Sequence, residues 1–274
     1  MPKKIIGFSG QREEVSPLKL DYNELLEMVS EMGFRLMFSG AEIYRVEESI
    51  SRLLQAYGAE RGEVFAIPNC IIVSLTSPMG EPMTQIRRMP NHGTDIYLLE
   101  RYNDLCRRLC RETPPFEVAL DSMREIERTH KVYSLPTQLA AHFLGCGMFS
   151  LFYGGSVWDG LCGGLCSMVI CLCLALTSRL GANLFFKTIA GAAASAFVAL
   201  ALTAVGVGQN SDSIIIGALM ALVPGIAFTN AMRDIMAGDM VAGISKAAEA
   251  LLIGAAIALG TALALGLIRP LMGG

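Results

Sequence analysis

The segment 222–249 combines residue types that can bind a small charged molecule within an apolar region. Pro224 and Gly225 interrupt an apolar run, and a proline inside a helix removes a backbone donor and clashes with the preceding turn. A broken helix is tolerated in a membrane only where protein or a water-filled cavity satisfies the freed backbone groups. The polar side chains of Thr229, Asn230 and Arg233 follow the break. Because a guanidinium can hold a carboxylate with two hydrogen bonds, we predict a binding site formed by Pro224, Gly225, Thr229, Asn230 and Arg233.

Three carboxylates accompany this segment and are candidates for carrying a proton or holding an ammonium group. Asp234 and Asp239 follow the break, and Glu249 lies about two turns inside the last apolar run. An acid inside a membrane is costly and therefore predicts a function, so we assign proton coupling to these three residues. Simpler interpretations stay open: the break could be only a kink, Arg233 could extend to the membrane boundary, and Lys246 could neutralise Glu249.

A second charged cluster marks the start of a helix in the N-terminal half. Ser39, Glu42, Arg45 and Glu48 fall within ten residues, and two carboxylates beside an arginine suit acid–base chemistry. The structural interpretation is favoured, because Ser39 and Glu42 have the spacing of a capping box, and Glu48 precedes Arg52 by four residues, as in an exposed ion pair. A functional acidic cluster that faces the membrane half is the alternative.

Composition separates the chain into a charged half and an apolar half. Of 274 residues, 53% are hydrophobic and 17% charged, whereas about a quarter are charged in soluble proteins. Residues 1–134 hold 17 Lys and Arg and 20 Asp and Glu, and residues 135–274 hold five of each class. The net charge is −3 without a basic tract, so no nucleic-acid binding is expected. A single soluble enzyme, a disordered chain and a secreted disulfide scaffold are excluded.

The charged half has the pattern of a small cytoplasmic α+β domain at 21–134, preceded by a flexible tail at 1–20. A helix is expected to begin at Asp21, a suitable N-cap, and to end at Ser39-Gly40. Runs rich in β-branched residues at 63–68, 70–77 and 83–89 predict two or three antiparallel strands. Further helices are expected at 41–57, 95–111 and 115–130.

The apolar half, 135–274, predicts five transmembrane helices. Runs of about 20 mostly apolar residues, the length a bilayer requires, occur at 135–153, 161–178, 184–205, 213–231 and 244–268. With the charged half inside, the turns inside contain four basic residues and those outside contain none, as the positive-inside rule requires. We therefore expect an α-helical membrane protein with five transmembrane helices after a small cytoplasmic α+β domain, its N-terminus cytoplasmic and its C-terminus outside.

Small residues and cysteines are interpreted as packing residues. Two sets of small residues repeat every four positions: Gly191, Ser195 and Ala199, and Gly254, Ala258 and Ala262. Such faces let helices approach closely, or serve sliding or a second subunit. The eight cysteines form no C-x-x-C pair and have no nearby histidine, so we expect reduced, packed thiols, without a metal site or a cofactor.

Three segments carry a resemblance to a known family. FSGAEIYRVEESI (38–50), GTDIYLLERYNDLCRRL (93–109) and LVPGIAFTNAMRDIMAGDMVAG (222–243) are similar to the threonine/serine exporter family of the ThrE type. The motif S-G-A-E-x-x-R-V-E lies in the charged half and the motif P-G-x-x-x-x-N-x-x-R-D in the apolar half, in the order of that family.

The resemblance implies a multi-pass exporter of small polar metabolites in a bacterial inner membrane. Family members are linked to efflux of threonine and serine driven by the proton motive force, and others to dicarboxylates such as succinate. Some are single chains with about ten spans, and others are split, so five spans resemble the large subunit of a split pair. The expected partner is a smaller membrane-only subunit, placed antiparallel, or a second copy in a homo-oligomer.

Two other function classes remain open at this stage. The charged half could be an enzyme or a ligand sensor that the apolar half only anchors, although an anchor needs one span rather than five. A passive channel would show flux without dependence on a proton gradient.

Overall fold

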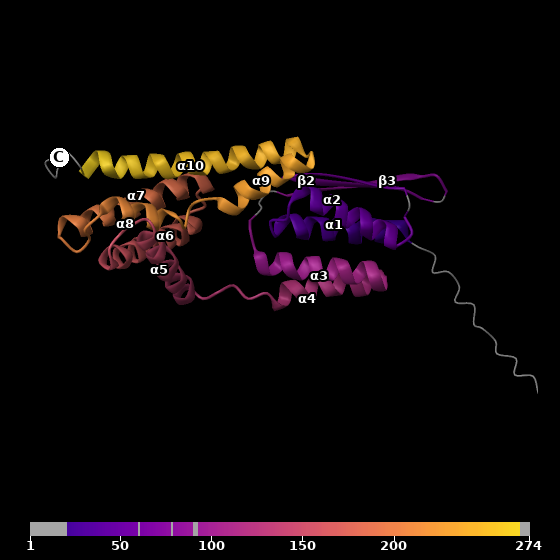
Figure 1. The fold of residues 1–274 in the computed structure, drawn as a ribbon. Coiled ribbons are helices and arrows are strands. Elements are labelled where there is room, and N and C mark those ends of the chain that lie inside the picture. The colour runs from indigo at the N-terminus through magenta and orange to yellow at the C-terminus, as the bar shows by residue number, and fades with distance from the viewer. Residues whose placement is uncertain (1–20, 60, 78, 90–92, 269–274) are drawn as a thin grey trace, which may run out of the picture.

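The computed structural model describes residues 21–59, 61–77, 79–89 and 93–268, which form two joined parts (Figure 1). The N-terminal domain contains α1 (Tyr22–Phe38), α2 (Ile43–Ala56), β1 (Gly62–Ile67), β2 (Cys70–Thr76), β3 (Pro82–Arg88), α3 (Ile96–Glu112) and α4 (Phe116–Thr129). The membrane part contains α5 (Leu135–Phe152), α6 (Val157–Arg179), α7 (Leu184–Ala204), α8 (Ser211–Leu219), α9 (Gly225–Ala237) and α10 (Met240–Ile268). The predicted tail at 1–20 lies outside the described residues.

The N-terminal domain has three layers. Its strands form an antiparallel sheet in the order β1-β2-β3, α1 and α2 pack on one face of the sheet, and α3 and α4 pack on the other side of α1 and α2 (Figure 1). The helices and antiparallel strands predicted from the sequence are confirmed, with ends that differ by at most two residues. Asp21 caps α1 as predicted, since its carboxylate accepts from the backbone N–H of Asn23 at 2.9 Å.

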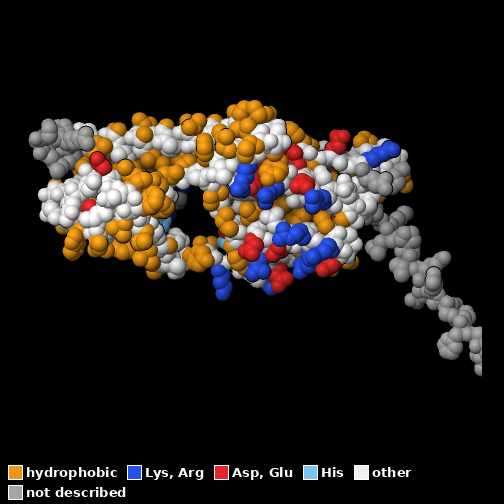
Figure 2. All heavy atoms as spheres, viewed as in Figure 1, with side chains coloured by type: hydrophobic (Ala, Val, Ile, Leu, Met, Phe, Trp, Pro, Cys, Tyr) orange, Lys and Arg blue, Asp and Glu red, His pale blue; other side chains and the backbone are white. Residues whose placement is uncertain are grey.

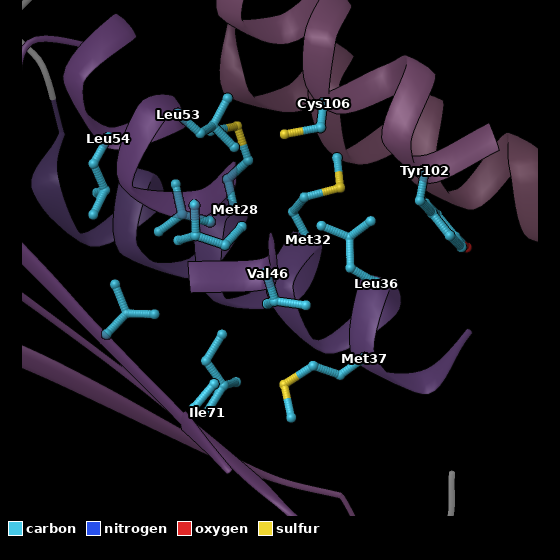
Figure 3. Packing of buried hydrophobic residues seen from close by; sticks show 14 of the residues in the cluster. Met28, Met32, Leu36, Met37, Val46, Leu53, Leu54, Ile71, Tyr102 and Cys106 are labelled. Carbon is cyan, nitrogen blue, oxygen red and sulfur yellow. The ribbon is translucent and has the colours of Figure 1, made fainter. Parts of the chain in front are cut away.

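The apolar face of α1 forms the centre of the domain's core. Leu25, Met28, Val29 and Met32 are fully buried, and Figure 3 shows the α1 side chains directed toward α2 and β2. Each such side chain contributes about 1.5–3 kcal/mol when fully buried. The domain therefore has a hydrophobic core of its own, which Ala242 of α10 joins at the junction with the membrane part.

One local prediction in this domain is wrong, because Ser39 and Glu42 do not form a capping box. The Ser39 hydroxyl instead donates to the carbonyl oxygen of Arg35 at 2.8 Å and so closes α1. Helix α2 begins only at Ile43, which puts Glu42 at the N-cap rather than at the third helical position, and its side chain makes no cap hydrogen bond. The Glu42 carboxylate is directed to Arg233, 191 residues away in sequence.

Within the described ranges, three helices are long and apolar enough to cross a membrane, namely α6, α7 and α10. Five spans therefore remain a prediction. The expected fourth span at 213–231 is interrupted: α8 has nine residues and α9 has 13, and neither has the length of about 20 residues that a bilayer requires. Figure 2 shows that charged side chains cluster on the N-terminal domain and are sparse on the membrane part.

The turns at the two ends of the membrane part are held differently. Far from the N-terminal domain (Figure 1), the Asp159 carboxylate accepts from the backbone N–H groups of Gln209 at 2.6 Å and Asn210 at 3.0 Å. These hydrogen bonds join the α5–α6 turn to the α7–α8 turn. The two turns that the sequence predicts outside therefore lie at the same end of the membrane part. At the opposite end, Leu184 at the start of α7 borders the N-terminal domain.

Small residues pack α7 as expected, whereas the small-residue face predicted for α10 is not packed within this chain. Gly191, Ser195 and Ala199 are all buried, whereas Ala258 and Ala262 of α10 are exposed. The set of α10 that is buried instead consists of Ala256, Gly260 and Ala264. A Cβ at Gly260 would collide with the backbone of α7, so the crossing with α7 decides which face of α10 is buried.

Candidate functional site at the junction of the two parts

The break predicted at Pro224-Gly225 is confirmed, and it directs α9 onto the N-terminal domain. Pro224 is the N-cap of α9, and the chain from Met220 to Pro224 is not helical. Because proline cannot donate a backbone hydrogen bond, α9 starts anew rather than continuing α8. Helix α9 then packs against α2 (Figure 1).

Three side chains of α9 bind the segment that joins α1 to α2. The Asn230 amide donates to the carbonyl oxygen of Gly40 at 3.2 Å, and Arg233 Nη1 donates to Glu42 Oε1 at 2.7 Å. Asp234 Oδ1 accepts from the backbone N–H of Ile43 at 2.9 Å. Asp234 thus caps the N-terminus of α2 from the membrane part, where a negative charge is favourable. The two sequence motifs therefore meet in space.

A buried ion pair adds α10 to this junction. Lys246 Nζ lies 3.0 Å from Asp234 Oδ2 and donates to the carbonyl oxygen of Ala41 at 3.3 Å. The Asp234 side chain is 0% exposed and that of Lys246 is 10% exposed. Burying two charges is favourable only with close geometry and further hydrogen bonds, which Ala41 and Ile43 supply. We call the Asp234–Lys246 pair, with the contacts of Asn230 and Arg233, the interdomain latch.

Two carboxylates of the N-terminal domain near the latch differ in their affinity for protons. Burial raises the pKa of Glu42, but hydrogen bonds from Arg233 and from backbone, with the nearby charge of Arg45, outweigh burial and lower the pKa overall. Burial raises the pKa of Glu47, more than the hydrogen bond from the Ala66 N–H lowers it. Glu42 therefore stays charged further into acid than Glu47.

A cavity of about 170 Å³ lies beside the latch. Its polar lining residues are Thr94, Asn230, Lys246 and Glu249, and its apolar walls include residues of α1, α7 and α10. A wider groove of about 340 Å³ shares Leu184, Glu249 and Ile253 with the cavity. Glu249 therefore stands where the cavity meets the groove.

The structure divides the predicted binding residues between the cavity and the latch. Asn230 belongs to both, and Arg233 is directed to Glu42. The Thr229 hydroxyl donates to the carbonyl oxygen of Gly225 at 2.9 Å, and its residue is exposed. Pro224 and Gly225 position α9.

The residues predicted for proton coupling are likewise separated. Glu249 lines the cavity, Asp234 is engaged in the latch, and Asp239 lies in the turn between α9 and α10. In the N-terminal motif, Glu48 pairs with Arg52 at 2.5 Å on an exposed face as predicted. Glu42 instead faces the membrane part, as the alternative interpretation expected.

Several groups of the junction were not identified from the sequence. Lys246 was considered only as a neighbour of Glu249, although it pairs with Asp234. The other contacts use backbone groups, namely the carbonyls of Gly40 and Ala41 and the N–H of Ile43. A sequence does not indicate which backbone groups take part in such contacts, because every residue has them. The co-occurrence of two polar motifs in one chain is the signal that could have suggested their contact.

The ThrE family model, described as "Putative threonine/serine exporter", matches residues 27–268, which include both motifs of the latch. The chain belongs to this family. A family relative is the "Probable threonine/serine exporter" of Mycobacterium tuberculosis (strain ATCC 25618 / H37Rv), 26% identical over 250 residues.

The match covers 90% of this chain and 46% of that relative, so the chain spans about half the relative's length. No solved structure matches the chain. Family membership and the apolar helices together make this a membrane protein of an exporter family. Within the membrane part, the polar side chains of Asn230, Arg233, Asp234 and Lys246 meet the N-terminal domain at the junction described above.

Proposed function

We propose that this chain is one half of an exporter for small zwitterionic amino acids of the threonine and serine class, and that the solute binds in the cavity at the latch. The observation that carries the proposal is the polar lining of the cavity, in which Lys246 and Asn230 accompany Glu249. The name of the family and of the relative supports the same class of solute.

The size of the cavity favours a small solute. An engineered cavity of about 150 Å³ binds benzene, and drug-sized ligands occupy sites of about 300–1,000 Å³. A volume of about 170 Å³ therefore suits a single small amino acid and is too small for a peptide.

The charges of the lining favour a zwitterion over a dicarboxylate. The Lys246 ammonium and the Asn230 amide can donate to a carboxylate, and the Glu249 carboxylate can accept from an ammonium group. A dicarboxylate would bring its second negative charge toward Glu249, which costs free energy unless that group is protonated. The threonine and serine class is therefore preferred over succinate-like solutes.

In this proposal, the latch couples solute binding to the position of α9. The solute carboxylate competes with Asp234 for Lys246, which would loosen the contact between α9 and α2. Protonation of Glu249 would release the ammonium group and return the site to its empty state. Helix breaks that offer polar groups to a solute are a recurring feature of transporters.

The proposal includes a second membrane unit and an orientation. Because the chain spans about half of its relative, we propose that a smaller membrane-only subunit, or a second copy, completes the pathway. Arg179 and Lys187 flank the turn between α6 and α7. This turn lies at the end of the membrane part that borders the N-terminal domain. The positive-inside rule then supports an N-terminal domain on the cytoplasmic side. The membrane in this proposal is a bacterial inner membrane.

Solute binding can be measured directly on the purified full chain in lipid nanodiscs. We expect radiolabelled threonine to bind and to be displaced by serine but not by succinate. Glu249→Gln is expected to weaken threonine binding at least about tenfold, the loss of one charged hydrogen bond. Glu48→Gln, on the exposed face of α2, is the matched control and should bind as the unchanged chain does.

Cells that express the chain with a membrane-only partner test transport. After loading with threonine-containing dipeptides, we expect threonine release that Glu249→Gln abolishes and that a protonophore reduces. Release that persists under the protonophore would favour the passive channel. Turnover by the N-terminal domain in place of solute release would favour the enzyme or sensor alternative. Preferential binding of succinate would overturn the assignment to amino acids.

A further inference from the structure

A groove of about 610 Å³ between α2 and α3 is not used by the export proposal. Its lining includes four arginines, Arg45 and Arg52 from α2 and Arg107 and Arg111 from α3. The volume lies in the range of about 300–1,000 Å³ that is typical of small-ligand sites. It is therefore much larger than the cavity at the latch and belongs wholly to the N-terminal domain.

The groove has an excess of positive charge. Glu48 is its acidic lining residue and pairs with Arg52 at 2.5 Å, and Arg107 pairs with Asp104. Arg111 has no ion pair among the described residues. A cleft lined by one sign of charge raises the local concentration of oppositely charged ligands, so this groove suits an anionic ligand.

Two thiols open into the same groove. Cys106 and Cys110 are one helical turn apart on α3, and both belong to the groove lining. Cys106 is buried, and its Sγ lies 3.8 Å from the carbonyl oxygen of Ser49, whereas Cys110 is half-buried. Cys110 is therefore the thiol that a ligand in the groove can reach.

The surroundings of Cys110 favour its reactive form. The neighbouring Cys106 thiol and the positive charge of Arg52 lower the pKa of Cys110 below its ordinary value, although burial acts in the opposite direction. The thiolate is the nucleophile in thiol chemistry. A lowered pKa increases the fraction of Cys110 that is thiolate at neutral pH, which favours attack on a disulfide.

We propose that Cys110 is a site of reversible modification by an anionic low-molecular-weight disulfide held by the arginines of this groove. The Cys110 thiolate attacks one sulfur of the reagent and forms a mixed disulfide. The reagent's own S–S bond breaks, and its other half leaves as a thiolate that takes a proton from water. The protein thiol is oxidised and the released half of the reagent is reduced, and a second thiol reverses the exchange.

The test uses the full chain in nanodiscs and two disulfide reagents of different charge. Oxidised glutathione is the anionic probe, and hydroxyethyl disulfide is the uncharged one, with peptide mass spectrometry used to measure the rate at each cysteine. We expect Cys110 to react with oxidised glutathione at least about tenfold faster than Cys70, the size of a typical steering effect. Cys70 is the matched control because it is also half-buried in the N-terminal domain.

Two variants separate the contributions of charge and hydrogen bonding. The double variant Arg52→Gln/Arg111→Gln should lose the preference of Cys110 for the anionic reagent. Its reaction with the uncharged reagent should slow less, only by the smaller thiolate fraction that follows from the loss of the Arg52 charge. Cys106→Ala should shift the pH dependence of the Cys110 reaction upward, because the hydrogen bond that stabilises the thiolate is lost. Equal rates at Cys110 and Cys70, or an unchanged preference in the double arginine variant that melts as the unchanged chain does, would overturn the proposal.

Discussion

The buried carboxylate of Asp234 makes the strongest prediction about how the two parts stay together. Asp234→Ala removes the partner of Lys246 and the acceptor for the Ile43 N–H in one step. Lys246 would keep its hydrogen bond to the Ala41 carbonyl oxygen at 3.3 Å. Breaking a buried pair by removing one partner costs about 3–5 kcal/mol, so we expect the docked state to lose about that much free energy.

The full burial of Asp234 places this estimate well above the effect of a surface pair. Its side chain is 0% exposed, whereas Glu48 and Arg52 are 54% and 70% exposed. An exposed helical pair contributes about 0.3–0.5 kcal/mol. Glu48→Ala is therefore a control that should change the stability of docking by less than about 0.5 kcal/mol.

Hydrogen exchange of the α2 backbone in the full chain measures the effect. A loss of about 3–5 kcal/mol corresponds to an increase of about two to nearly four orders of magnitude in exchange at the first turn of α2. The double variant Asp234→Ala/Lys246→Met should be less perturbed than the sum of its single variants, because it leaves no unpaired charge. Additive single effects, or an increase in exchange below about tenfold for Asp234→Ala, would refute the reasoning.

Three further predictions concern pH, a carboxylate of α2 and helix packing. The pKa of Glu42 in the folded chain is lower than its ordinary value of 4.5. The stability that charged Glu42 contributes to docking is therefore fully present above pH 4.5 and is lost as pH falls through the lowered pKa. Hydrogen exchange of α2 should show docking weaken in that range, and Arg233→Gln should flatten this pH profile. Glu47→Ala leaves the β1 amide that it binds without its partner, and should lower the free energy of unfolding by about 1 kcal/mol; an unchanged value in chemical denaturation would contradict this. Gly260→Leu should lower the melting temperature by overpacking the α7–α10 crossing, at a cost of about 1–3 kcal/mol, whereas Gly266→Leu, which faces open space, should melt nearly unchanged.

Local sequence signals predicted the elements of the N-terminal domain well. The apolar spacing of α1, its Asp21 cap and the β-branched runs of β1 and β2 act over a few residues, and the structure contains them within two residues. The break at Pro224 is equally local, because a missing backbone donor affects only its own turn.

Predictions that depended on a helix's neighbours were less successful. Ser39 and Glu42 have the spacing of a capping box, but Arg233 draws the Glu42 carboxylate away from α2. Ala258 and Ala262 repeat at a packing interval, but α7 contacts the face of Gly260 instead. In both cases the local pattern allowed two outcomes, and a contact distant in sequence selected one.

Composition and residue order are enough to predict that a charged α+β domain precedes an apolar helical part and that a polar segment follows a helix break. These properties depend on composition and short-range periodicity, which the order of residues contains directly. The capping of α2 by α9 and the pairing of Lys246 with Asp234 became visible only in the folded chain. The fold also places Asn230, Lys246 and Glu249 around one cavity. Such contacts join residues up to 205 positions apart, and their partners are set by the packing of whole helices.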